Sequence, residues 1–511
     1  MAKQRRQAVL ALAPLALLLS QPTQAAWKFT PTLELRETYT DNLRLAREGR
    51  EQSDWITEIT PGFTVSKRSD RVRFDATYQL HYFAGASDIG GEVDRAQSAL
   101  AARLNAELVG DWLYFDGAAS ISQQPVSAFG PLLSDRAYAN INNTEVRTYS
   151  ASPYLRHRFG STATAELRYV RDKVDTGRNR LGNNDGQTIA LSVASGSRFT
   201  DLGWNVLLRE QRIDDDLAPE TSAAVASLGL RYRLGRTMAL TGNVGYDKYD
   251  YAALGGVTEG RSWSVGGIYT PSSRTRIEAS AGRRFYGDSY SLSASHRARR
   301  AVFSLSYSDA VTNTRSQFLL PSTVDTAALL DSLFLSAIPD PVARRAAVEA
   351  YILATGLPPS LADSINYFSN RYFLQKQLRA AVVLRGARTR TVLSVYGTRR
   401  TALSTAEADS AILGPSSLTQ NDNTEQRGAS AVWNYRLDGK TDFNASVDAY
   451  RVESITTGLV RNHSATRLSL HRQFERKLSG VLELRRITGP VLGGRDKYVE
   501  NALSAGVMMK F

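Results

Sequence analysis

The chain has 511 residues, a net charge of +13 and no cysteine, and it is rich in tyrosine and glycine. The absence of cysteine excludes a disulfide framework and thiolate chemistry. Beyond residue 26, no stretch approaches the roughly 20 apolar residues that a membrane-spanning helix needs. The chain is nevertheless longer than one soluble core usually serves. This combination favours a transmembrane β-barrel, because the strands of such a barrel are only half apolar.

Residues 1–26 have the pattern of a signal peptide. The basic stretch MAKQRRQ is followed by the apolar run AVLALAPLALLL and by a small-residue exit at Ala25 and Ala26. A membrane anchor is the weaker alternative, because an apolar run of about 12 residues is too short to cross a bilayer. We therefore expect export, cleavage near Ala25 or Ala26, and a barrel domain over residues 27–511.

Alternating segments recur from the start of this domain. In RVRFDATYQLHYF, apolar or aromatic residues occupy every second position from Val72 to Tyr82, and polar or charged residues fill the positions between. TATAELRYV and SLGLRYRL repeat this pattern. A period of two predicts β-strands with one apolar face. A soluble β-sandwich would show the same alternation. The lengths of the connections between the strands are therefore needed to distinguish a sandwich from a barrel.

The connections alternate in length. Short polar turns such as SKRSD, RFGS, LGRT and LDGK are separated by longer connections that are charged or rich in Asn, Asp and Gly. Outer-membrane barrels have short periplasmic turns and long external loops, whereas a sandwich has no such parity. The sequence therefore predicts an all-β, transmembrane, antiparallel outer-membrane β-barrel of about 22 strands with both termini in the periplasm.

One long connection breaks the strand pattern. Residues 322–366 contain apolar residues at helical spacing, an Asp-Pro start and a glycine stop, which predict two amphipathic helices inside an external loop. This helical insert could plug the lumen, cap the barrel mouth, bind a partner protein, or pack only on itself. The residues that define it are Leu330, Leu333, Phe334, Ile338, Asp340, Pro341, Val348, Tyr351, Ile352 and Gly356.

The chain ends on an alternating strand with a terminal aromatic residue. Leu503, Val507, Met509 and Phe511 share one parity. Such an ending resembles the signal by which the barrel assembly machinery of bacteria recognises outer-membrane proteins. We expect these four residues to face outer-membrane lipid after that machinery has acted.

The strand face opposite the apolar one is basic. If the apolar face contacts lipid, this face lines the lumen, and acidic residues such as Asp75 and Glu166 share it. Cross-strand pairing explains part of the charge, and a remaining positive bias would favour anionic solutes or polymers. Nucleic acid is a poor candidate, because the pattern follows strand parity. The arginines assigned to the lumen are Arg71, Arg73, Arg168, Arg231, Arg233, Arg276, Arg284 and Arg467.

No catalytic, cofactor or metal motif is recognisable. The five histidines have no metal-ligand spacing, so we expect neither a metal nor a cofactor. Some outer-membrane barrels are hydrolases, and His81 with Asp75 on the same strand face is the place where such a site would lie. A polar lumen residue is the better interpretation of His81, and we expect no enzyme activity.

The phrases WKFTPTLELRETYTDNLRL, SDWITEITPGFTVSKRSDRVRFDATYQL and IPDPVARRAAVEAYILATGLP resemble the outer-membrane β-barrel proteins associated with PEP-CTERM/exosortase systems. The resemblance runs over essentially the whole chain after residue 26. It implies a Gram-negative outer-membrane barrel from loci that make exopolysaccharide and sort PEP-CTERM proteins. It brings no catalytic residues to this sequence.

Passive passage of exopolysaccharide, or of a related exported product, through a polar lumen is therefore the expected function, with the helical insert and external loops as the gate. The expected partners are outer-membrane lipid, anionic exopolysaccharide and periplasmic export components. A non-conducting barrel that anchors a secretion or biofilm assembly is the alternative. A TonB-type transporter is less favoured, because its plug is a separate N-terminal domain and strands are expected here from about Lys28.

Overall fold

The computed structural model describes residues 27–84, 96–131, 142–177, 183–216, 219–255, 257–319, 371–405, 420–491 and 496–511. The expected signal peptide, and all the residues that define the expected helical insert, lie outside these ranges. Within them, no helix is long and apolar enough to cross a membrane.

The described chain is almost entirely β-strand. Within the described residues, the only α-helix longer than a single turn is α1 (Thr314–Leu319). The strands are β1 (Lys28–Thr40), β2 (Asp54–Arg68), β3 (Val72–Ala84), β4 (Ala96–Val109), β5 (Leu113–Pro125), β6 (Asn143–Phe159), β7 (Ala163–Thr176), β8 (Asn184–Ser195), β9 (Leu202–Asp215), β10 (Thr221–Arg233), β11 (Met238–Asp250), β12 (Glu259–Ser272), β13 (Thr275–Arg284), β14 (Gly287–Arg297), β15 (Ala301–Asn313), β16 (Tyr372–Arg385), β17 (Thr389–Ala402), β18 (Asn423–Arg436), β19 (Thr441–Ser454), β20 (Val460–Glu475), β21 (Leu478–Pro490) and β22 (Lys497–Lys510).

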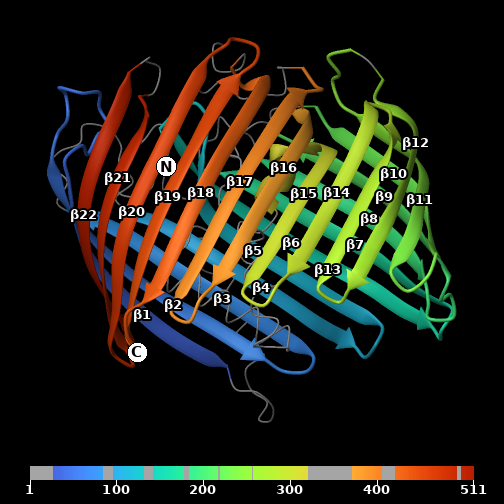
Figure 1. Cartoon of the computed structure of the whole chain (residues 1–511), viewed down its shortest axis with the longest axis horizontal. Coiled ribbons are helices and arrows are strands. Elements are labelled where there is room, and N and C mark those ends of the chain that lie inside the picture. The colour runs from blue at the N-terminus through green and yellow to red at the C-terminus, as the bar shows by residue number, and fades with distance from the viewer. Residues whose placement is uncertain are drawn as a thin grey trace, which may run out of the picture.

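These strands form one closed antiparallel barrel. Each strand pairs with the next in sequence, and β1 pairs with β22 to close a 22-stranded sheet, as Figure 1 shows. The closing register places Thr32 opposite Lys510 and Thr40 opposite Ala502. The backbone N–H of Phe511 extends this ladder by donating to the carbonyl of Pro31 at 3.0 Å. The predicted fold class and strand number are therefore confirmed.

The barrel has a short-turn end and a long-loop end. The turns at residues 69–71, 234–237 and 437–440 lie at the same end as Phe511, whereas most connections at the other end are longer. The exception is the β13–β14 hairpin, which turns on Phe285 and Tyr286. Gly287 follows this turn at a φ of +114°, a conformation that glycine tolerates readily.

The outer face of the wall is the apolar parity of each strand. On β1 and β22 the outward residues Leu33, Leu35, Val507 and Met509 lie opposite one another and are exposed. Trp27, Trp112 and Trp433 are also exposed, near the short-turn end of their strands. An apolar belt with aromatic residues near its edge is the exterior that a membrane-spanning barrel presents to lipid.

The lipid-facing parity gives a direct stability prediction. Leu468 lies mid-strand on β20 and faces outward, whereas the next residue, Ser469, faces the lumen opposite Glu483. Leu468→Arg is expected to destabilise the barrel by about 2–4 kcal/mol, because arginine would enter the hydrocarbon layer. Ser469→Arg is the matched control and is expected to cost less than half of that. Urea unfolding in lipid vesicles measures both, and equal losses would contradict the assigned parity.

A sharp bend of the wall occurs between β12 and β13. A Cβ atom at Gly282 would lie 2.0 Å from the carbonyl oxygen of Trp263, and one at Gly266 would lie 2.3 Å from that of Ala279. Both positions face the lumen, where the bend crowds the backbone. Glycine therefore allows the sheet to turn at the edge of the barrel where Figure 1 places β10, β11 and β12.

Candidate functional site

The lumen wall is polar, and over β12–β15 it carries small hydroxyl side chains. Directly opposed pairs such as Ser280 and Ser291 hydrogen-bond across strands, with 2.7 Å between their Oγ atoms. This serine surface offers donors and acceptors without blocking space. Its members are Ser262, Ser264, Ser280, Ser289, Ser291, Ser293, Ser295, Ser304, Ser306 and Ser308.

The arginines assigned to the lumen from sequence lie on inward-facing strand positions, apart from Arg71, which lies in the turn before β3. Four of them have acidic partners. Arg284 Nη2 is 2.7 Å from Asp247 Oδ1, and Arg276 Nη2 is 2.9 Å from Glu278 Oε2. Arg467 Nη1 is 4.0 Å from Asp448 Oδ2, and Arg168 belongs to the group described next.

Arg73, Arg231 and Arg233 form no ion pair with any residue in the described ranges, and all three lie near the short-turn end. Part of the positive bias expected for the lumen therefore lies at that end. The transport role suggested for these arginines stays a prediction.

A stacked tyrosine pair faces the lumen near the same end. The rings of Tyr114 on β5 and Tyr154 on β6 are 5.1 Å apart and nearly parallel. The guanidinium of Arg168 on β7 lies over the Tyr154 ring at 3.8 Å, and that of Arg156 lies 5.3 Å from its centre. We call these four residues, with Asp116 and Glu166, the Tyr154 cluster.

Carboxylates hold the two arginines of the Tyr154 cluster in place. Arg168 Nη1 is 2.8 Å from Asp116 Oδ2, and its Nε is 2.9 Å from Glu166 Oε1. Arg156 Nη2 is 2.6 Å from the other oxygen of Glu166 and remains half exposed. The cluster therefore presents a fixed aromatic surface with charged donors at its edge. Sequence reasoning found Arg168 and Glu166 but missed both tyrosines, although their inward parity marks them.

The long-loop end of the lumen is crossed by segments of the chain itself. Residues 126–131, which follow β5, are buried inside the barrel. Ala128 and Phe129 pack there against Phe373 on β16, Ala402 on β17 and Val452 on β19. Figure 1 shows β5 and these three strands in opposite walls. This loop therefore spans the lumen.

Helix α1 is a second crossing segment. It follows β15 and contacts β6 and β7, which lie in a distant part of the wall. Its Arg315 is buried, donates to the carbonyl oxygen of Asp172 at 3.1 Å, and pairs with the carboxylate of the same residue. A buried guanidinium needs such a partner, because an unpaired charge is costly inside a protein.

A third crossing joins two loops that follow non-neighbouring strands. Residues 252–254 after β11 exchange backbone hydrogen bonds with residues 403–405 after β17, and Ala253 bridges to Ser404. The ring of Tyr251 stacks on that of Tyr372 with 4.9 Å between centroids. Burial raises the pKa of Tyr251 to about 12, so its phenol stays neutral at physiological pH.

His81 also faces the lumen, where it contacts two residues of β2. Its Nδ1 lies 2.5 Å from Glu58 Oε1 and 3.2 Å from Thr60 Oγ1. Asp75, the expected partner if the site were hydrolytic, lies 3.5 Å from Arg68. Within the described part of the chain, no group of three or more His, Cys, Asp or Glu residues is arranged to hold a metal ion.

The C-terminal residues singled out from sequence lie together on the outer face. Leu503, Val507, Met509 and Phe511 are all exposed there, at the seam where β22 meets β1. This position suits contact with lipid. Their recognition by an assembly machinery stays a prediction.

No protein-family model matches the sequence, and no curated protein matches it. Among solved structures, the FrpB iron transporter from Neisseria meningitidis (F5-1 variant) matches with a TM-score of 0.51 and 10% identity over 94% of this chain and 82% of its own. Its apoprotein form matches with a TM-score of 0.50 and 10% identity over 94% and 81%. The siderophore receptor PirA from Acinetobacter baumannii covers 96% of this chain and 81% of its own at 8% identity, with a TM-score of 0.49. The likeness to FrpB shows a shared barrel fold.

The protein is a bacterial outer-membrane β-barrel. A closed antiparallel barrel with an apolar, aromatic-edged exterior and a polar interior is the strand architecture that spans this membrane. By the rule for such barrels, the short turns and Phe511 face the periplasm, and the crossing segments lie towards the cell exterior. The lumen is thus lined by accessible basic residues at its periplasmic end and crossed by chain segments at its extracellular end.

Proposed function

We propose that the protein is a gated outer-membrane channel for an anionic, hydroxyl-rich polymer that enters from the periplasm. The observation that carries this proposal is the asymmetry of the lumen. Unpaired Arg231 and Arg233 and the Tyr154 cluster are accessible at the periplasmic end, whereas the segments 126–131 and α1 cross the extracellular end. The resemblance to PEP-CTERM-associated barrels favours exopolysaccharide as the polymer.

The chemistry of the lumen suits such a polymer. Arginines attract carboxylate or phosphate groups and bind them through two parallel hydrogen bonds. The apolar faces of sugar rings pack on tyrosine rings such as the stacked pair Tyr114 and Tyr154. The serine surface over β12–β15 exchanges hydrogen bonds with sugar hydroxyls as the chain moves past.

The fold shared with FrpB favours a second candidate, which is uptake of an iron chelate by a TonB-type mechanism. In that case the substrate binds first at the extracellular end. A non-conducting anchor is the third candidate, and the buried pair between Arg315 and Asp172 favours it because this pair holds the crossing helix in place.

Block of ionic current by an acidic oligosaccharide tests the channel proposal. The protein is refolded in planar bilayers with its crossing segments loosened, as described in the Discussion, and the oligosaccharide is added to one side at a time. Block from the periplasmic side only is expected. Block from the extracellular side only, by a ferric chelate and not by the oligosaccharide, would favour uptake. A silent but folded barrel would favour the anchor.

Removing the unpaired arginines should weaken that block. For Arg231→Ser/Arg233→Ser, the oligosaccharide concentration for half-block is expected to rise at least tenfold, because a hydrogen bond to a charged group contributes about 1.5 kcal/mol. No acidic residue loses its ion-pair partner, since neither arginine has one in the described ranges. Arg212→Ser is the control, because Arg212 faces outward on β9 and pairs with Glu210. An unchanged half-block in the double variant would contradict the assigned polymer path.

A further inference from the structure

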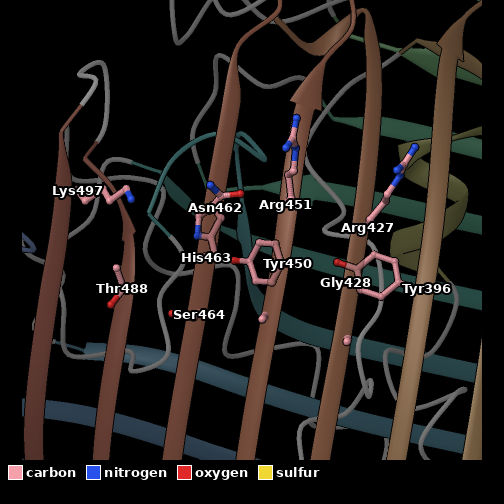
Figure 2. A pocket seen from close by; sticks show the side chains of 12 residues that line it. Tyr396, Arg427, Gly428, Tyr450, Arg451, Asn462, His463, Ser464, Thr488 and Lys497 are labelled. Carbon is pink, nitrogen blue, oxygen red and sulfur yellow. The ribbon is translucent and has the colours of Figure 1, made fainter.

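A hollow of about 630 Å³ lies over β17–β22, towards the extracellular end. Its upper part is lined by Arg427 on β18, Arg451 on β19, Asn462 on β20 and Lys497 on β22, as Figure 2 shows. The pairing register places all four on the outward parity, the same parity as the exposed Trp433 and Val447. The hollow therefore opens mainly to the membrane side of the wall, where most of its lining side chains lie.

The shallow floor of the hollow results from short outward side chains. Ala429, Ala449 and Ser464 lie side by side on β18, β19 and β20, directly below the basic residues. Tyr450 and His463 also line the hollow, but their rings lie on the inward parity and stack with 4.5 Å between ring centres. The wall behind the hollow is thus packed, and its outer surface is recessed.

Two arginines stand directly opposite each other at the upper edge. Arg427 on β18 pairs in register with Arg451 on β19, although like charges in this arrangement repel. Each contacts a glutamate on its own strand, Glu425 or Glu453, yet their side chains remain 74% and 55% exposed. A guanidinium has five N–H donors, so both keep donors for an anion placed between them.

The positive excess is largest in this sector of the outer face. On β6–β12 most outward basic residues have an acidic partner: Arg147 with Glu145, Arg171 with Asp185, Lys173 with Asp175, Arg212 with Glu210 and Lys248 with Glu259. Arg261 on β12 also faces outward and forms no ion pair within the described residues. On β17–β22 the outward basic residues outnumber the acidic ones, Glu425 and Glu453. These basic residues are Arg399, Arg427, Arg451, Arg486 and Lys497.

The position of the hollow indicates the chemistry of its occupant. Below its floor, the outward residues Ala431, Val447 and Leu468 continue the apolar belt, and the short-turn end lies beyond them. The arginines therefore stand where lipid head groups of the outer leaflet meet the hydrocarbon layer. Basic pockets at this level bind anionic head groups, and arginine binds phosphate through paired hydrogen bonds.

We propose that this hollow binds one phosphate-bearing glycolipid of the outer leaflet. Its phosphate lies between Arg427 and Arg451, its sugars contact Asn462 and Lys497, and its acyl chains run over Ala429 and Ala449 towards the apolar belt. The recess accommodates the first segments of these chains, and the anion relieves the repulsion between the two arginines.

Native mass spectrometry of the detergent-solubilised full chain tests this proposal, using diphosphorylated lipid A as the probe. One lipid A is expected to stay bound to the wild type. Arg427→Gln/Arg451→Gln should lower the apparent affinity at least tenfold, whereas Arg171→Gln/Lys173→Gln on the opposite, charge-balanced wall should leave it unchanged. The slower migration of each variant after boiling for gel electrophoresis confirms that the unboiled barrel is folded.

Two further probes separate a lipid from other sources of phosphate. Dephosphorylated lipid A should bind at least tenfold more weakly than the diphosphorylated form, and inorganic phosphate should not displace the lipid at equal concentration. The proposal is overturned if the double glutamine variant binds like the wild type. It is also overturned if dephosphorylated lipid A binds equally well, or if inorganic phosphate alone occupies the arginines and no lipid is retained.

Discussion

Glu500→Ala is expected to lower the free energy of unfolding by about 3–5 kcal/mol. Glu500 on β22 and Arg485 on β21 face the lumen with side chains that are 0% and 2% exposed, and Arg485 Nη2 lies 2.9 Å from Glu500 Oε1. Thr40 on β1 donates its hydroxyl to the same carboxylate oxygen at 3.1 Å. Removing the carboxylate leaves a buried guanidinium without this partner at the seam that closes the barrel.

Two variants separate the loss of this pair from a general effect of substitution. Arg485→Met/Glu500→Leu removes both charges and should recover at least half of the lost stability, because apolar residues of similar volume replace a buried ion pair at little cost. Glu453→Ala breaks an exposed outward pair and should change stability by less than about 1 kcal/mol. Urea unfolding in vesicles, followed by tryptophan fluorescence, measures all three. An equal loss in the double variant would contradict the role assigned to the buried charge.

The wall of the barrel could be predicted from sequence because lipid imposes a strict rule on each strand. Every outward position must be apolar over the membrane thickness, so Val72 to Tyr82 on β3 reveal both the strand and its faces. The same parity places Arg168 and Glu166 together in the lumen. The alternation that marks each strand spans only a few residues. Strands that pair in the barrel are also consecutive in sequence, so their pairing can be predicted from residues that are close together in the chain.

No such rule applies to the loop segments that fold into the lumen. The segment VSAFGP, which contains Phe129, has the sequence of an ordinary external loop. Phe129 contacts Phe373 in the opposite wall only because the barrel closes. Arg315 and Asp172 are likewise far apart in sequence and belong to segments with no shared period. Inward-folded loops pack by shape and by individual charge pairs, so a single sequence gives no repeating signal for them. The outer-face hollow was missed for a related reason, because its arginines break the apolar parity that the strands otherwise obey.

Loosening two crossing segments is expected to open the channel. In Phe129→Gly/Arg315→Ala, the loop 126–131 loses its buried aromatic anchor and α1 loses its buried ion pair with Asp172. Each change lowers the stability of the closed arrangement by about 3 kcal/mol or more. Even 3 kcal/mol of differential stability raises the open population roughly a hundredfold. Current in planar bilayers should therefore rise from rare, brief openings in the wild type to sustained conductance in the variant.

The matched control for this variant is Phe474→Gly/Arg276→Ala. Phe474 faces outward and is exposed, and Arg276 lines the lumen in an exposed pair with Glu278, so neither belongs to a crossing segment. This control should stay as closed as the wild type. If the Phe129 and Arg315 variant folds and inserts but remains equally silent, these segments do not close the lumen. If the wild type conducts steadily, the barrel has no closed resting state. Only a gate at the extracellular end predicts that the two variants differ while their barrels are equally folded, since Phe129 and Arg315 both lie outside the strands.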